Sequence, residues 1–195
     1  NIMIDSLFNN LERSKSSTIH KDLGLEKGAY AVLTLHRPSN VDEKDAFMRI
    51  LAALEHIGGR LPLVFPLHPR TRIRAEEFGL TKRLESIPNI VLTGPAGYLD
   101  FVALMAESKL VLTDSGGLQE ETTALGIPCL TLRENTERPI TVTEGTNTIV
   151  GNTTDVIQEA ANDILDNGGK AGRIPDLWDG RTAERIADII EDTIS

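Results

Sequence analysis

A turn of small residues, Ser115-Gly116-Gly117, joins an apolar segment of strand length to a segment with helical periodicity. Serine is a good helix N-cap, and glycines let another group approach the backbone closely. The free N–H groups and positive dipole end at a helix start form an anion site, most naturally for phosphate. Glu121 lies four residues beyond Gly117 on the same helical face, where its carboxylate could accept hydrogen bonds from sugar hydroxyls. Together these residues predict a nucleotide site.

The same residues also have a purely structural interpretation. Glycine-rich turns between a strand and a helix are common in α/β proteins. Glu120 and Glu121, near the start of the helix, would then only complement the positive end of its dipole. Spacing alone leaves both interpretations open.

Histidine and arginine side chains follow other strand-like segments. His36 and Arg37 come directly after the first segment, His68 directly after the second, and Arg138 close behind the fifth. In an acidic chain, cations gathered at strand ends indicate an anionic small-molecule ligand. The arginines in the run 70–74 have a second interpretation, as a solvated helix face.

The composition excludes several classes of function. The 195 residues carry 20 basic and 29 acidic side chains, and this formal charge of −9 argues against a general nucleic-acid surface. No stretch approaches the roughly 20 apolar residues that cross a bilayer, and no signal peptide opens the chain. The histidines show no metal-ligand spacing, and the single Cys129 cannot form an intrachain disulfide. We therefore expect a cytoplasmic protein with no metal, membrane or nucleic-acid partner.

Apolar segments of strand length alternate with helix-period segments, the pattern of a parallel sheet covered on both faces. The sequence predicts strands at 30–35, 61–67, 90–93, 110–113, 128–132 and 148–150. It predicts helices at 43–57, 98–106, 115–125, 155–166 and 182–193, and a further amphipathic segment from 2 to 11. Residues 40–43 resemble a capping box for the helix at 43–57. The expected fold class is α/β, a Rossmann-like doubly wound sheet whose ligand sits where the winding reverses.

Five short motifs occur in a fixed order along the chain. They are Leu35-His36-Arg37, Leu67-His68-Pro69, the octapeptide 114–121, Leu125-Gly126-Ile127-Pro128 and Thr136-Glu137-Arg138-Pro139. This set resembles the C-terminal half of the non-hydrolysing UDP-N-acetylglucosamine 2-epimerases. The resemblance implies one half of a glycosyltransferase-B-like two-domain enzyme with its active site in the cleft. Residues 1–195 would be the C-terminal UDP-binding domain, with 1–25 as an interdomain helical segment and the N-terminal catalytic half absent.

The family interconverts UDP-N-acetylglucosamine and UDP-N-acetylmannosamine without a cofactor. It eliminates UDP, removes the C2 proton to give a 2-acetamidoglucal, and adds UDP back to the other face. The resemblance implies that Ser115 and the Gly116 amide hold the diphosphate and that Glu121 holds the ribose. His36 and Arg138 would meet the departing UDP, because positioned cations stabilise the charge that elimination builds.

The resemblance also implies a second ligand site. In bacterial members a second UDP-N-acetylglucosamine acts as an activator, and Arg37 and His68 would face it. The chain departs from the family's motifs at Pro38-Ser39, where many members have Arg-Glu, and at Thr122-Thr123, where Ala-Pro is common. These changes leave His36 and Arg37 in place but blur the details of the second site.

Three functions of different classes stay open from the sequence alone. The chain is the UDP-binding half of an epimerase (an isomerase), the donor-nucleotide half of a glycosyltransferase-B-type glycosyltransferase, or a non-catalytic nucleotide-sugar sensor. In the epimerase, the carboxylates that move the C2 proton belong to the missing half, so we expect this chain alone to bind UDP weakly and to catalyse nothing. Because Asn1 rather than Met opens the chain, we expect a fragment or a processed chain. The resemblance implies that the full-length protein is a homodimer.

Overall fold

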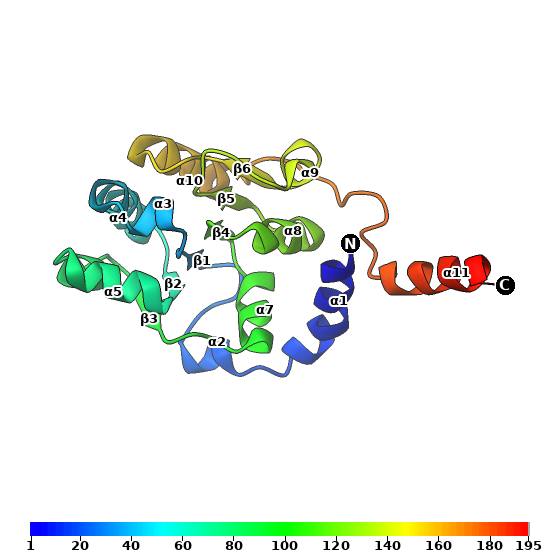
Figure 1. The fold of residues 1–195 in the computed structure, drawn as a ribbon. Helices are drawn as coiled ribbons and strands as arrows, with labels where there is room; N and C mark the ends of the chain where they lie inside the picture. The colour runs from blue at the N-terminus through cyan, green and yellow to red at the C-terminus, as the bar shows by residue number, and fades with distance from the viewer. Residues whose placement is uncertain (195) are drawn as a thin grey trace.

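The computed structural model describes residues 1–194 and contains one six-stranded sheet (Figure 1). All strand pairs are parallel, in the order β3-β2-β1-β4-β5-β6. This order winds outward in both directions from β1 and β4, so the predicted doubly wound, Rossmann-like fold is confirmed. Ser195, the last residue of the predicted domain, lies outside the described residues. The strands are β1 (Ala31–Thr34), β2 (Leu63–Pro66), β3 (Ile90–Thr93), β4 (Leu110–Thr113), β5 (Cys129–Thr131) and β6 (Asn147–Ile149).

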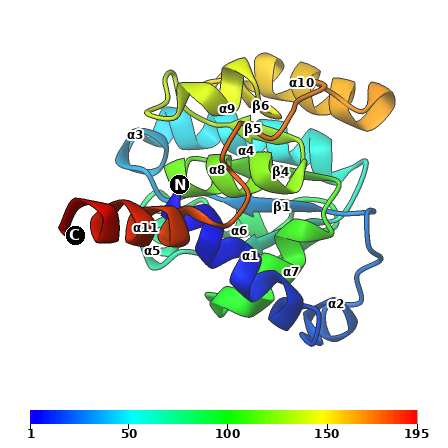
Figure 2. The same cartoon turned by 90° about the vertical axis from the view of Figure 1, so that its right-hand side faces the viewer.

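Helices cover both faces of the sheet (Figures 1 and 2). One face packs against α4, α5, α6 and α10, and the other against α1, α7 and α8. The helices are α1 (Ile2–Ser14), α2 (Ile19–Asp22), α3 (Pro38–Val41), α4 (Lys44–Gly58), α5 (Pro69–Glu77), α6 (Thr81–Glu85), α7 (Tyr98–Ala106), α8 (Gly116–Leu125), α9 (Pro139–Thr143), α10 (Thr154–Asn167) and α11 (Thr182–Ile194).

The strand sequences are continuous apolar runs because both of their faces are buried. Successive side chains of a strand point to opposite faces, so Ala31 and Leu33 of β1 enter the core beneath α4 and α10 while Val32 enters the core beneath α1 and α7. Each fully buried Val or Leu side chain stabilises the fold by roughly 1.5–3 kcal/mol relative to an exposed one. Cys129 of β5 is a buried free thiol in the same sheet.

The six predicted strands are confirmed, each within two residues of its expected bounds, and the long predicted helices correspond to α1, α4, α7, α8, α10 and α11. Five short helices have no predicted bounds, namely α2, α3, α5, α6 and α9, although the arginine run 70–74 of α5 was interpreted as a helix face. Three of these begin with a proline at the first helical position, namely Pro38, Pro69 and Pro139. Proline suits that position because its fixed φ is helical and its missing N–H would have no acceptor there. The prolines were therefore a signal in the sequence for the start of α3, α5 and α9.

The predicted capping box at 40–43 is wrong. Asn40 lies inside α3, where its buried side chain donates from Nδ2 to the carbonyl of Leu132 at 2.7 Å. The N-cap residue of α4 is Glu43, and its side chain makes no capping hydrogen bond. Asn40 thus points into the molecule because α3 already turns the chain before α4 begins.

The last helix, α11, extends away from the body of the domain in both views (Figures 1 and 2). Its first turn is tied to α1, because the backbone N–H of Ala183 donates to Asp5 Oδ2 at 2.7 Å. Four large apolar side chains on it are exposed: Ile186, Ile189, Ile190 and Ile194. None of the helices in residues 1–194 has the length and apolar character that a bilayer crossing requires.

Candidate functional site

Residues from two neighbouring strands meet where the winding of the sheet reverses. β1 and β4 are paired with Thr34 opposite Thr113, so the segments that follow them share one edge. His36 Nδ1 lies 2.8 Å from Asp114 Oδ1. The other carboxylate oxygen, Oδ2, accepts hydrogen bonds from the backbone N–H groups of His36 at 2.9 Å and Arg37 at 2.7 Å. The Asp114 side chain is fully buried, whereas that of His36 is 36% exposed.

Asp114 is held in its ionised form. Burial by itself raises the pKa of this carboxyl, but hydrogen bonds from the His36 side chain and from the backbone of Arg37 and His36 outweigh burial and bring the pKa below its ordinary value. Asn40 adds a further donor, Nδ2 at 3.3 Å from Oδ2. Asp114 was not among the predicted site residues, although its place directly after a buried strand was a signal for such a role.

His36, His68 and Ser115 line one cavity of about 280 Å³ at this edge. Much of the remaining lining is apolar: Leu35, Pro66, Pro69, Pro95, Ala96, Phe101 and Leu118. The two imidazole rings face each other with centroids 5.3 Å apart. His68 precedes α5 as its N-cap residue, and its Nδ1 accepts the backbone N–H of Arg70 at 3.1 Å. The structure thus brings three of the predicted site residues together.

The helix α8 begins beside this cavity. Ser115 is its N-cap residue as predicted, yet the serine side chain makes no capping hydrogen bond. The Ser115 backbone N–H instead donates to Thr113 Oγ1 at 3.0 Å. The amides that open the helix, starting at Gly116, have no acceptor within it and lie at the positive end of its dipole. This is the arrangement that binds phosphate at helix starts.

The two glycines of the turn have different surroundings. A side chain at Gly117 would meet Met3 Cε at 2.9 Å, so this glycine makes room for α1. At Gly116 the nearest atom to an added Cβ would be Glu137 Oε2 at 3.8 Å, an ordinary contact. Packing within the described chain therefore does not require glycine at position 116.

Glu121 is buried one turn into α8, with 7% of its surface exposed. Tyr98, the first residue of α7, donates its hydroxyl to Glu121 Oε1 at 3.4 Å. Burial raises the pKa of Glu121 to about 7, the Tyr98 hydrogen bond offsets this in part, and the neighbouring Glu120 adds to the rise. The carboxyl is thus half ionised near neutral pH. Tyr98 was not among the predicted site residues.

Arg138 lies outside the cavity of His36, at the start of α9. Its Nε is 3.0 Å from Glu120 Oε1, and that glutamate side chain is 9% exposed. Glu120 Oε1 also accepts a hydrogen bond from Asn1 Nδ2 at 2.9 Å. The adjacent Glu137 is bound by Arg133 through two contacts of 2.7 Å. Arg138 is therefore joined to α8 through Glu120 and has no direct contact with His36.

The arginines of the run 70–74 are not a free anion site. Arg70 and Arg74 both bind the carboxylate of Asp42, Arg74 Nε at 2.9 Å from Oδ1. Hydrogen bonds from Arg70 and Arg74, more than offsetting burial, hold the pKa of Asp42 at about 2. Arg72 is exposed, as the solvated-face interpretation predicts.

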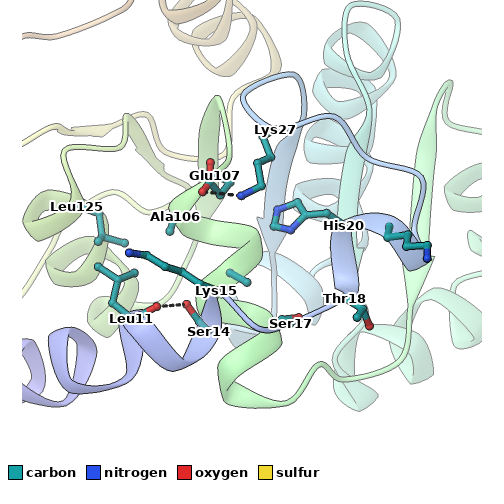
Figure 3. A pocket seen from close by; sticks show the side chains of 12 residues that line it. Leu11, Ser14, Lys15, Ser17, Thr18, His20, Lys27, Ala106, Glu107 and Leu125 are labelled. Atoms are coloured by element: carbon teal, nitrogen blue, oxygen red, sulfur yellow. Dashed lines mark hydrogen bonds and ion pairs between the residues drawn. The ribbon is translucent and has the colours of Figure 1, made fainter.

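A second cavity, of about 370 Å³, lies near the opposite edge of the sheet (Figure 3). Two of its lining residues, Lys27 and Glu107, precede β1 and β4 and pair with each other at 3.0 Å. Burial lowers the pKa of His20 in the same lining. The opposite charges of Lys27 and Glu107 neutralise each other, so we assign this cavity no binding or catalytic role.

Within residues 1–194, no group of three His, Cys, Asp or Glu side chains could hold a metal ion.

Comparison with known proteins decides the family. The model of the UDP-N-acetylglucosamine 2-epimerase family matches residues 1–191. The chain belongs to this family. The resemblance seen in the sequence motifs is thereby confirmed.

The epimerase relatives are about twice as long as this chain. The UDP-N-acetylglucosamine 2-epimerase of Methanocaldococcus jannaschii is 40% identical over 163 residues, which are 83% of this chain and 44% of that protein. A UDP-2,3-diacetamido-2,3-dideoxy-D-glucuronate 2-epimerase of Pseudomonas aeruginosa is 38% identical over 167 residues, with the same coverage of 83% and 44%. The crystal structure of the M. jannaschii epimerase with UDP-GlcNAc and UDP superposes with a TM-score of 0.86 at 36% identity, over 98% of this chain and 53% of that one. The chain thus spans about half the length of its relatives.

Proposed function

We propose that this chain is the UDP-binding half of a UDP-N-acetylglucosamine 2-epimerase, an isomerase that interconverts UDP-N-acetylglucosamine and UDP-N-acetylmannosamine. The reaction eliminates UDP, removes the C2 proton and adds UDP back to the other face. The observation that carries the proposal is the start of α8, where Ser115 and the Gly116 amide open a helix beside His36 at the reversal of the sheet. The M. jannaschii relative, whose structure holds UDP-GlcNAc and UDP, supports it.

Each nucleotide group has a protein group of matching chemistry. The diphosphate binds the Ser115 hydroxyl, which makes no capping bond, and the Gly116 N–H. The ribose hydroxyls donate to the Glu121 carboxylate, whose Oε1 also accepts a hydrogen bond from the Tyr98 hydroxyl. Binding draws the Glu121 carboxyl into its ionised form, because hydroxyl donors favour the carboxylate.

The departing UDP is stabilised by two cationic groups. Cleavage of the C1–O bond leaves the electron pair on the diphosphate, so negative charge grows there in the transition state. The Arg138 side chain is 40% exposed and contacts Glu120 through Nε and the Glu137 carbonyl through Nη1, and its guanidinium turns toward this charge. His36 meets the same charge from the end of the neighbouring strand β1, and such positioned groups act because their interaction strengthens as charge develops.

A second UDP-sugar is proposed next to the first. Arg37 and His68 would bind it, since both lie on segments that border the site of His36. The Arg37 side chain donates from Nε to the Asp114 carbonyl at 3.3 Å, which leaves its terminal nitrogens for a ligand. We assign this ligand an activating rather than a reacting role.

The rest of the enzyme is an N-terminal half that supplies the carboxylates for C2 proton transfer. The domain assignment is therefore residues 1–195 as the C-terminal UDP-binding domain, with 1–25 leading in from the other half and the active site in the cleft. The N-terminal half would also cover the exposed isoleucines of α11, because an apolar helix face that extends from one half of the enzyme can pack against the other half. The full-length protein is proposed to be a homodimer.

The decisive experiment uses the full-length protein that contains this chain. UDP-N-acetylglucosamine is incubated in D2O without any acceptor and followed by proton NMR. We expect UDP-N-acetylmannosamine to form with deuterium at C2, because the C2 proton leaves for the solvent. UDP-2,3-diacetamido-2,3-dideoxy-D-glucuronate serves as a second substrate, in view of the P. aeruginosa relative. Sugar transfer that needs an acceptor would instead identify a glycosyltransferase, and unchanged substrate would identify a sensor.

The 195-residue chain itself is tested by isothermal titration with UDP, with CMP and GDP as controls. We expect weak, selective UDP binding, its loss in Ser115→Trp, and no epimerisation. Turnover by the chain alone would contradict the assignment of proton transfer to the other half.

A further inference from the structure

The two oxygens of Asp114 have separate tasks. Oδ2 accepts two backbone N–H groups, those of His36 and Arg37, at 2.9 and 2.7 Å. Among the described residues, the group that faces Oδ1 is the His36 ring, with Nδ1 at 2.8 Å. Because the carboxylate is buried and ionised, Oδ1 can only accept. Two acceptors do not remain 2.8 Å apart, so Nδ1 of His36 must carry a hydrogen.

We propose that Asp114 is a positioning residue that fixes His36 as the Nδ1–H tautomer and so presents Nε2 to the cavity. The proposal rests on the proposed function in one respect, namely that Nε2 faces the departing diphosphate. When Nε2 also carries a hydrogen, Nδ1–H remains paired with Asp114 and the Nε2–H donates to the oxygen that gains charge.

The neighbouring histidine provides an internal reference. His68 Nδ1 accepts the backbone N–H of Arg70 at 3.1 Å, so a neutral His68 must carry its hydrogen on Nε2. The two rings that face each other across 5.3 Å are therefore expected in opposite tautomers. His68 shares the cavity with His36 and has no carboxylate partner among the described residues.

The tautomers are measured by NMR of the 195-residue chain labelled with ¹⁵N-histidine, at a pH where the rings are neutral. His36→Gln and His68→Gln assign the two sets of signals. We expect the Nδ1–H pattern for His36 and the Nε2–H pattern for His68. A His36 ring protonated on Nε2 overturns the proposal, and this result needs no variant at position 114.

Asp114→Asn tests the cause. The asparagine oxygen has to face the two backbone N–H groups, so its NH2 group faces His36 and can only donate. Nδ1 must then become the acceptor, and we expect His36 to change to the Nε2–H tautomer. Asp42→Asn, which removes a carboxylate from the nearby segment before α4 without touching His36, should leave the tautomer unchanged. An unchanged tautomer in a folded Asp114→Asn chain overturns the proposal.

The effect on catalysis is measured in the full-length enzyme. Asp114→Asn should lower kcat by about 10²–10⁴-fold while KM changes little, because the nucleotide contacts remain but the amide that replaces the carboxylate cannot pair with Nδ1–H of the doubly protonated ring that faces the departing diphosphate. If kcat/KM falls by the same factor but mainly through a higher KM, Asp114 has a merely structural role, and this result would count against the proposal. If the wild-type enzyme shows no epimerisation, the proposed function fails, whereas the tautomer result still decides the role of Asp114.

Discussion

The buried carboxyl of Glu121 leads to a prediction in which stability and binding change in opposite directions. Burial raises the pKa of this group in the folded chain to about 7, against an ordinary value of 4.5. The interval between 4.5 and 7 corresponds to about 3 kcal/mol of unfavourable interaction with the ionised form. The folded chain therefore carries a penalty at neutral pH at a residue that we place against the ribose.

The sign of the pH dependence follows from proton binding in the two states. Between pH 4.5 and 7 the unfolded chain loses this proton while the folded chain keeps it, so the contribution of Glu121 to stability falls as pH rises. Above pH 7 the whole penalty is present. Glu121→Gln removes the ionisable group. We expect the free energy of unfolding of the variant to exceed that of the wild type by up to about 3 kcal/mol at pH 8 and to approach it near pH 4.5.

Urea denaturation of the 195-residue chain, followed by circular dichroism at pH 5, 6, 7 and 8, measures this difference. Glu76→Gln on the exposed surface of α5 is the control for the change of charge alone. A stability difference that does not grow with pH, or a Glu121→Gln chain that is less stable at pH 8, would refute the reasoning.

The same variant should bind UDP more weakly. In the wild type, ribose hydroxyls favour the carboxylate, so UDP affinity should rise between pH 5.5 and 7 and then level off. The diphosphate titrates in the same range, and Glu121→Gln retains that contribution. The difference between the two titration series therefore isolates Glu121.

Further predictions concern the glycine turn and Arg138. Gly116→Ala should leave the melting temperature nearly unchanged, since an added Cβ makes only an ordinary contact, yet lower UDP affinity about tenfold or more in isothermal titration by crowding the anion site. Gly117→Ala should also change the melting temperature little, because the added Cβ meets only the terminal Cε of the partly exposed Met3, which can shift, and alanine favours the helix. Arg138→Met in the full-length enzyme should lower kcat by about 10²–10³-fold and destabilise the fold by about 1 kcal/mol, since Glu120 loses its cation. Adding Glu120→Gln should restore the melting temperature but not turnover, and recovery of both would contradict the assignment of Arg138 to the departing UDP.

The parts of this fold that could be predicted are those set by local pattern. Strands buried on both faces are continuous apolar runs, and the small-residue turn at Ser115 directly after one of them marks the start of α8. The reversal rule then places His36 and Ser115 at one edge, as the structure has them.

The remaining contacts depend on where side chains reach in three dimensions. The sequence shows neither that Tyr98 donates to Glu121 nor that Glu120 binds Arg138, since each pair joins separate helices. Asn40 was predicted as a cap because its residue type suits one, yet Pro38 starts the preceding helix and turns that side chain inward. The hydrogen bond of Asn40 to the distant Leu132 carbonyl therefore outweighs the local preference of asparagine for an N-cap position.

The pairing of β1 with β4 explains why the site forms at this edge. Thr34 lies opposite Thr113, and their hydroxyl oxygens are 2.6 Å apart. Thr113 Oγ1 also accepts the backbone N–H of Ser115, so one buried hydroxyl joins the register of the sheet to the start of α8. With this register fixed, the segment after β1 brings His36 beside Asp114, and a slip of one residue would turn these side chains to the opposite faces. The helix start that we propose to bind the diphosphate and the histidine beside it therefore depend on the same strand pairing, although the two strands are far apart in the sequence.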